Sequence, residues 1–350
     1  MQPDWVPPGI DTDKANVARV YDYWLGGSHN FRADQDAARA MIAVEPNTRA
    51  IMRANRAFLG RAVRFLAAEA GIRQFLDIGS GIPTEQNVHE VAQDAAPGTR
   101  VVYVDIDEVA VAHSKLMLDG KPDVTVIQAD LREPARILAD PAAKLLIDFT
   151  QPVAVLLAAV LHFIPDADDP AKIVGTLRQA MAPGSYLVIS HACLDTDPDV
   201  AATSQSAYRS RIAGQMSMRT TEEIAGLFDG FTMVDPGVVW LPLWRPGPDD
   251  DVPDDPERYW CRVGVGRLSE LRLLPDAAVG LQPTVAIGTR PLSDRHDAWA
   301  DHLQSVEEPG DLPAIAGRDV GRDPLVVALR ARGHARPDVT GGVGHDEVTA

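Results

Sequence analysis

The chain has 350 residues, of which 45% are hydrophobic, and its formal net charge at pH 7 is −17. This length and composition are typical of a globular protein with one large α/β domain or two smaller ones. The acidic balance argues against general nucleic-acid binding, because that function needs a basic surface to neutralise phosphates. Cys193 and Cys261 are the two cysteines, and they lack the spacing of a zinc site or of a C-x-x-C motif.

The apolar stretches of the sequence do not indicate a membrane protein. The amino terminus lacks a basic stretch followed by an apolar one, so no signal peptide is predicted. The longest apolar run, at 152–165, is shorter than the roughly 20 residues that a membrane span requires. We therefore expect a cytoplasmic protein, in a reducing compartment that suits two free thiols.

Helical patterns fill the first part of the chain. The sequence NVARVYDYWLGG at 16–27 predicts an amphipathic helix that ends at its glycine pair, and a longer helix is expected over 48–70. We interpret residues 1–70 as a helical cap over the open end of a ligand crevice. The rings of Tyr21 and Tyr23 are candidates for contact with a cationic ligand, since aromatic faces attract positive charge. The alternative is that both tyrosines only pack the helix against the domain.

The sequence FLDIGSGIPT at 75–84 predicts a strand, a tight glycine turn and the start of a helix. Gly79 and Gly81 allow the backbone to approach a ligand closely, and the N–H groups of the next helical turn would point at it. A dinucleotide fingerprint has a third glycine where this chain has Thr84, which disfavours a nicotinamide oxidoreductase. Asp77 instead supplies a carboxylate that suits a ligand with a cationic amino-acid end.

Two more expected strands also end in a carboxylate. VVYVDID at 101–107 contains Asp105, about 24 positions after Gly81, close to the spacing at which an acid binds ribose hydroxyls. VTVIQAD at 124–130 ends in Asp130. Because the carboxyl ends of parallel strands form the ligand crevice of an open sheet, we expect Asp77, Asp105 and Asp130 to meet there.

The alternation of helices and strands continues to a fifth strand at 186–191 and predicts a Rossmann-like, doubly wound, mostly parallel α/β sheet. A last pair of strands is expected in GVVWLPL and YWCRVGVG, one of them antiparallel. We assign residues 71–266 to this domain. Residues 267–350, rich in Pro, Gly and charge, are predicted to be a mostly disordered tail, with a docking tail for a partner as the alternative.

His162 follows the expected fourth strand at 153–161, at the edge where ligand binds. With an ordinary pKa of about 6.5, a histidine there could remove a proton from a nucleophile. A wall on the adenine side of the binding site and a purely structural side chain are the alternatives. His162 and Tyr21 are the candidate catalytic residues. His89 and Glu90 lack the spacing of a zinc motif, and no metal is expected.

Several segments also resemble a known family. DIGSG, YVDID and QADLR look like the first three motifs of class I methyltransferases that use S-adenosylmethionine. NVARVYDYWLGGSHNF, GIPTEQNVHEVA and VAVLLAAVLHFIPD are similar to the actinobacterial S-adenosyl methyltransferase family, formerly a domain of unknown function, over roughly residues 8–266.

The resemblance implies a methyltransferase that uses S-adenosyl-L-methionine. In that case Gly79 and Gly81 would face the methionine part, Asp105 the ribose, and Asp130 with Leu131 the adenine. The cofactor-binding set that we predict is Asp77, Gly79, Ser80, Gly81, Asp105, Ile106, Asp130, Leu131 and Tyr23. The expected acceptor is a small molecule that the sequence does not identify, and a homo-oligomer is compatible with the chain. The alternative function is a catalytically silent protein that binds S-adenosylmethionine or a nucleoside.

Overall fold

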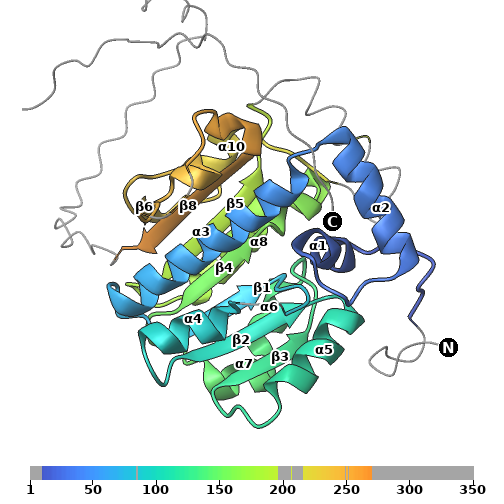
Figure 1. Ribbon diagram of the computed structural model, residues 1–350. Coiled ribbons are helices and arrows are strands. Elements are labelled where there is room, and N and C mark those ends of the chain that lie inside the picture. Colours follow the sequence, from blue (N-terminus) through green and yellow to red (C-terminus); the bar gives the residue numbers. More distant parts are fainter. Residues whose placement is uncertain are drawn as a thin grey trace, which may run out of the picture. The chain divides into compact units, whose positions relative to one another are not determined.

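The computed structural model describes residues 10–83, 86–195, 206, 216–248, 250 and 252–269 (Figure 1). Apart from residues 267–269, the predicted carboxyl-terminal tail lies outside these residues. Within the described part of the chain, no helix combines the length and the apolar character needed to cross a membrane.

A single eight-stranded sheet forms the centre of the described structure, with the strand order β3-β2-β1-β4-β5-β8-β6 and with β7 paired to β8 (Figure 1). Strands β1 to β5 are parallel where they pair, and β8 runs antiparallel to β5. The predicted Rossmann-like, mostly parallel sheet is therefore confirmed. The strand bounds are Gln74–Ile78, Arg100–Asp105, Val124–Gln128, Ala154–Ala158, Tyr186–Ala192, Phe231–Met233, Val239–Trp240 and Cys261–Leu268 for β1 to β8 in order.

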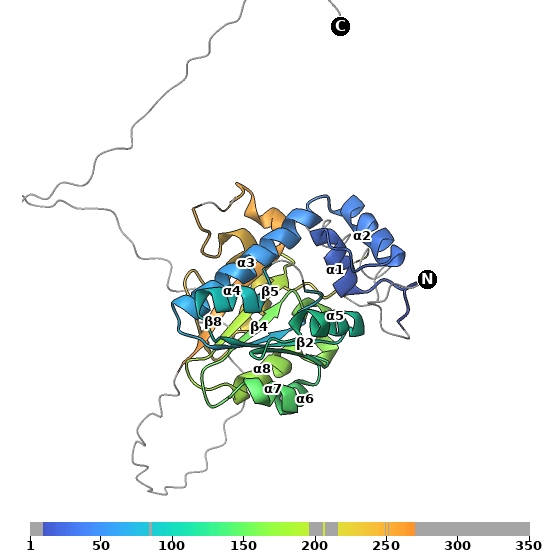
Figure 2. The same ribbon diagram turned by 60° about the horizontal axis from the view of Figure 1, so that its bottom comes forward.

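Helices cover both faces of this sheet. Figure 2 shows α3, α4 and α5 on one side and α6, α7 and α8 on the other. The bounds are Val17–Leu25 for α1, Arg32–Val44 for α2, Thr48–Ala68 for α3, Val88–Ala95 for α4, Glu108–Leu118 for α5, Pro134–Ala139 for α6, Pro141–Leu146 for α7, Pro170–Ala180 for α8 and Thr221–Gly226 for α10. Short 3-10 turns occur at Leu161–Phe163 (η1), Asp166–Asp168 (η2), Leu241–Leu243 (η3) and Pro256–Tyr259 (η4).

Alternate residues of the central strands feed two separate cores. Phe75 of β1 packs into the core that contains α3, whereas Leu76 packs into the core that contains α8. Neighbouring side chains of a strand point to opposite faces, so a strand buried on both faces needs the unbroken apolar run seen in the sequence.

The amino-terminal helices share the first of these cores. Val20 and Trp24 of α1 are buried in the same cluster as Phe58 of α3 and the strand residues. A buried ion pair, Arg19 Nε to Asp34 Oδ2 at 3.0 Å, joins α1 to α2. Helix α1 is thereby fixed above the sheet, at the edge where β1 and β4 end.

Candidate active site

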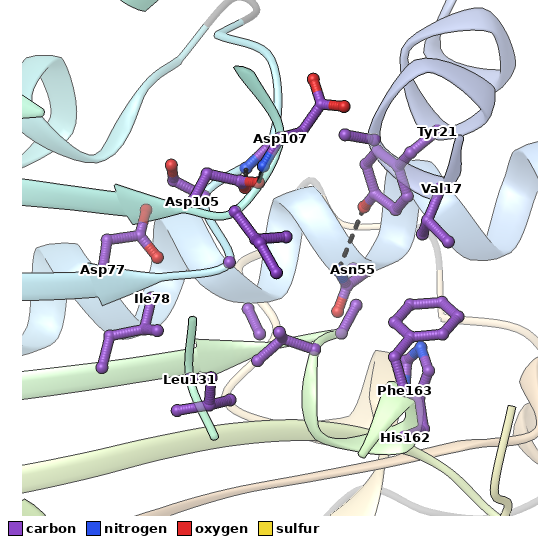
Figure 3. A pocket seen from close by; sticks show the side chains of 18 of the residues that line it. Val17, Tyr21, Asn55, Asp77, Ile78, Asp105, Asp107, Leu131, His162 and Phe163 are labelled. Carbon is purple, nitrogen blue, oxygen red and sulfur yellow. Dashed lines mark hydrogen bonds between the residues drawn. The ribbon is translucent and has the colours of Figure 1, made fainter. Parts of the chain in front are cut away.

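A cavity of about 370 Å³ lies at the carboxyl ends of the parallel strands, between them and helices α1 and α3. Figure 3 shows Asp77 and Asp105 on one side of it and His162 and Phe163 on the other. Its size falls within the range of small-molecule and cofactor sites. The predicted site residues that line it are Tyr21, Asp77, Gly79, Ser80, Gly81, Asp105, Ile106, Asp130, Leu131 and His162.

The glycine turn after β1 forms the floor of the cavity. Gly79 and Gly81 have φ angles of 75° and 67°, a left-handed conformation that side chains disfavour. The N–H groups of Gly79 and Ser80 both donate to the Val104 carbonyl, at 2.8 and 3.1 Å. A Cβ atom on Gly79 would clash with the Val160 side chain. The turn therefore requires glycine at position 79 for two independent reasons.

Asp105 ties this turn to the end of β2. Its Oδ2 accepts a hydrogen bond from Gly81 N at 2.6 Å, and its Oδ1 accepts one from Asp107 N at 2.8 Å. Burial raises the pKa of the Asp105 carboxyl to about 6, against the opposing effect of these backbone donors. Asp105 therefore links the end of β2 directly to the glycine turn after β1.

Asp77 is only 4% exposed. Burial raises its pKa to about 7, with the Arg56 guanidinium acting in the opposite direction and the Asp105 carboxylate adding to the rise. Two buried carboxylates near each other make this side of the cavity favourable for a positive charge.

The outer end of the cavity is built from the loops after β2 and β3. Asp130 binds Arg132 through both carboxylate oxygens, with Nη2 to Oδ2 at 2.6 Å. Burial alone would raise the pKa of Asp130, but the hydrogen bonds from Arg132 outweigh it and lower that pKa. Leu131 is buried, whereas Ile106 is 56% exposed, which is unusual for a large apolar side chain. Together they offer apolar surface to a flat ring.

The opposite end of the cavity, which we call the aromatic lobe, is lined by Tyr21, Met52, Asn55, His162, Phe163 and Trp260. The Tyr21 hydroxyl donates to the Met52 carbonyl at 3.4 Å and accepts from Asn55 Nδ2 at 3.1 Å. Burial raises the pKa of Tyr21, so the phenol stays protonated at neutral pH.

His162 lies in η1, directly after β4. Its Nδ1 faces the backbone N–H of Ala192 at 3.4 Å and accepts from it, so the proton of the neutral ring is on Nε2. Burial is the main cause that holds the pKa of His162 well below its usual value, and the positive charges of His191 and Arg219 lower it further. Because Nδ1, the nitrogen without a proton, already accepts from Ala192 N–H, His162 is better placed to line the cavity and to donate a hydrogen bond than to act as a base.

A buried arginine fixes the turn that carries His162. Arg219 donates to the carbonyls of Leu161 and Ile164 at 3.2 and 2.9 Å and to Asp166 Oδ1 at 2.6 Å. It also contacts Nε2 of His191 at 2.8 Å. Sequence reasoning missed this residue, because nothing in the local pattern around position 219 indicates its distant partners.

Tyr23 is not among the residues that line the cavity. The guanidinium carbons of Arg39 and Arg49 lie over its ring, 5.6 and 5.4 Å from the centroid. The two arginines thus take up the cation-binding faces that made Tyr23 a candidate for the cofactor site. No group of His, Cys, Asp or Glu suited to a metal ion occurs in the part of the chain that the structure describes.

A family model described as S-adenosyl methyltransferase matches residues 3–269. The chain belongs to the S-adenosyl methyltransferase family. The resemblance read from the sequence is confirmed, and with it the assignment of the chain as an enzyme whose cofactor is S-adenosylmethionine.

Two solved structures are similar to this S-adenosyl methyltransferase. A provisionally assigned methyltransferase from Thermobifida fusca is 42% identical, with a TM-score of 0.72, over 77% of this chain and 100% of that chain. A DUF574 family protein from Streptomyces avermitilis is 39% identical, with a TM-score of 0.71, over 73% of this chain and 98% of that chain. None of the curated proteins compared with the chain matches it.

The residues of the cavity fit S-adenosylmethionine chemically. The cofactor carries an ammonium group and a sulfonium, and Asp77 and Asp105 supply buried negative charge. The glycine turn lines the cavity, and a Cβ atom at position 79 would collide with Val160, another lining residue. Ser80 Oγ is buried and has no hydrogen-bond partner among the described residues, so it is available to a polar ligand.

Proposed function

We propose that this methyltransferase transfers the methyl group to a small-molecule acceptor that binds in the aromatic lobe. The observation that carries this proposal is the division of one cavity into two chemically different ends. One end has buried carboxylates and a glycine turn, and the other is aromatic and apolar (Figure 3). Such a lobe suits a small ligand with few polar groups, because apolar walls with a few placed polar atoms are typical of small-molecule sites.

We assign the cofactor to the first end, residue by residue. Asp77 and the backbone of Gly79 and Gly81 would hold the methionine part, with the carboxylate opposite the ammonium group. Asp105 would bind the ribose hydroxyls through the lone pairs that its backbone donors leave available. Ile106 and Leu131 would enclose the adenine, and Asp130 lies beside them, held in place by Arg132.

When bound, S-adenosylmethionine supplies a methyl group on a positively charged sulfur. The chain's own contribution is to position an acceptor at contact distance and to exclude water. The rings of Tyr21 and Phe163 present aromatic surface that stabilises a nearby cation. His162, neutral and with its proton on Nε2, can donate a hydrogen bond to the acceptor. Tyr21 keeps its proton and holds Asn55, so we give it a positioning role instead of a proton-transfer role.

A labelling experiment tests the size of the acceptor. The full chain is incubated with methyl-labelled S-adenosylmethionine and, separately, with the low-molecular-mass, protein and nucleic-acid fractions of a bacterial lysate. The proposal predicts label in the low-molecular-mass fraction, lost when Asp105→Ala protein is used. Label in the protein or nucleic-acid fraction would show that the acceptor is a macromolecule and that the proposal is wrong.

A further inference from the structure

Asn55 carries an unpaired polar atom in the aromatic lobe. The residue is 5% exposed, and its Oδ1 is buried without a hydrogen-bond partner among the described residues. A buried acceptor left unpaired costs about 1 to 3 kcal/mol, so such atoms are rare and call for an explanation.

The orientation of the Asn55 amide follows from its neighbour. Tyr21 has a single hydroxyl hydrogen, which it donates to the Met52 carbonyl. The hydroxyl must therefore accept from Asn55, and only the amide nitrogen can donate. Oδ1 is consequently at the other end of the amide. Figure 3 shows it pointing away from Tyr21, and Asn55 is among the residues that line the cavity.

The position of Asn55 in the fold separates it from the cofactor end. Figure 3 shows Asn55 beside Tyr21 and apart from Asp77, and Cys261, which lines the same cavity, begins β8 on the far side of β5. The turn and strand ends that would hold the cofactor belong to β1, β2 and β3, on the other side of β4. The six residues of the lobe carry no formal charge when His162 is neutral, and the nearby charge is the Arg56 guanidinium, which lines the same cavity and acts on Tyr21.

We infer that Asn55 Oδ1 accepts a hydrogen bond from an N–H or O–H group of the methyl acceptor and selects for it. The acceptor class is thus a small, mostly apolar molecule, flat enough to lie among aromatic side chains, with at least one such donor. This inference rests on the proposed function and adds to it the feature by which the lobe tells acceptors apart. A site built to hydrogen-bond an N–H or O–H discriminates strongly against analogues that lack the group, because its own polar atom is then left unpaired.

Two probes of nearly equal shape test the inference. Indole carries an N–H donor and benzothiophene does not. Their affinities for the full chain saturated with S-adenosylhomocysteine are measured by saturation-transfer NMR titration. We expect wild-type protein to bind indole about tenfold more tightly than benzothiophene. In Asn55→Leu protein the ratio falls to about one, while the affinity for S-adenosylhomocysteine, measured by calorimetry, is unchanged.

Asn47→Leu is the matched control, since Asn47 is an exposed asparagine at the start of the same helix with no side-chain capping bond. It should keep the wild-type ratio. Equal binding of the two probes by wild-type protein, or no detectable binding of either, overturns the inference without any variant. An unchanged ratio in Asn55→Leu shows that an ordered water, not a ligand, satisfies Oδ1. A loss of S-adenosylhomocysteine affinity in that variant with the probe ratio intact assigns Asn55 to the cofactor. If wild-type protein fails to bind S-adenosylhomocysteine, the proposed function itself fails.

Discussion

Replacing Asp77 by asparagine is expected to make the cofactor-free protein more stable at pH 8 and to weaken its binding of S-adenosylhomocysteine. The carboxyl is 4% exposed, and burial is the main cause of its high pKa. An acid whose pKa is higher in the folded than in the unfolded state binds more protons when folded. Stability therefore falls as the pH rises, between the two pKa values. Asparagine keeps the shape and removes the charge, so the variant escapes this loss.

The size of the effect follows from the pKa. A rise from 3.8 to about 7, at about 1.36 kcal/mol per pKa unit, makes the ionised carboxylate cost about 4 kcal/mol above pH 7. At pH 5 the same two values give a cost of about 2 kcal/mol, and near pH 3 the cost vanishes. The negative charge of Asp77 attracts the ammonium group of the ligand, so the carboxylate lowers the stability of the cofactor-free protein but raises its affinity for the cofactor.

Urea denaturation of the cofactor-free protein at pH 5 and pH 8 measures the stability of wild type and Asp77→Asn. Calorimetric titration with S-adenosylhomocysteine gives the affinities. Asp119→Asn, at an exposed position at the end of α5, is the control and should change neither quantity. A variant that is less stable than wild type at pH 8, or one whose stability equals that of wild type at both pH values, would refute the reasoning. So would an unchanged affinity.

Three further changes test separate parts of the site. Asp105→Ala should lower S-adenosylhomocysteine affinity at least about tenfold by calorimetry, because both carboxylate oxygens organise the turn; an unchanged affinity would make the ribose assignment wrong. Gly79→Ala should destabilise the protein by about 1 to 3 kcal/mol more than Gly98→Ala, because both glycines have positive φ but only a Cβ at position 79 would meet a side chain. In urea denaturation, adding Val160→Ala to Gly79→Ala should remove that difference. If it does not, the clash with Val160 is not the cause. Arg219→Met should lower the free energy of unfolding by about 3 kcal/mol, because it leaves the buried carbonyls of Leu161 and Ile164 unpaired. Arg219→Lys should lower it less. An unchanged free energy of unfolding in Arg219→Met would show that the turn is stable without the arginine.

Much of the fold could be predicted because its signal is local. The apolar runs of β1, β2 and β4 and the helical stripes between them each span enough residues for a period to show. The three-residue strand β6, Phe231–Met233, was missed because so short a segment shows no periodic pattern. It is a strand because its backbone pairs with that of β8.

The cofactor end of the site was also predictable, since glycines and strand-ending acids are placed by sequence order. The partners of those acids were not. The pairing of Asp130 with Arg132 depends on a side-chain conformation, and the position of Tyr23 depends on Arg39 and Arg49 from other helices.

Asn55 did leave a signal that the sequence analysis passed over. It falls in line with Ile51, Phe58 and Ala62 on the buried face of α3, where an amide is out of place. A polar residue inside an apolar helical stripe either pairs with a distant group or faces a ligand. The structure shows that Asn55 pairs with Tyr21 through its nitrogen and that its oxygen has no partner among the described residues, which is the basis for our inference of a ligand contact.

The most direct test of the account is a crystal structure of the full chain with S-adenosylhomocysteine. The account predicts the amino-acid end of the ligand beside Asp77 and the glycine turn, the ribose on Asp105 and the adenine between Ile106 and Leu131. The aromatic lobe would remain open for an acceptor. A ligand bound outside this cavity, or one that fills the aromatic lobe, would contradict the assignment of the two ends.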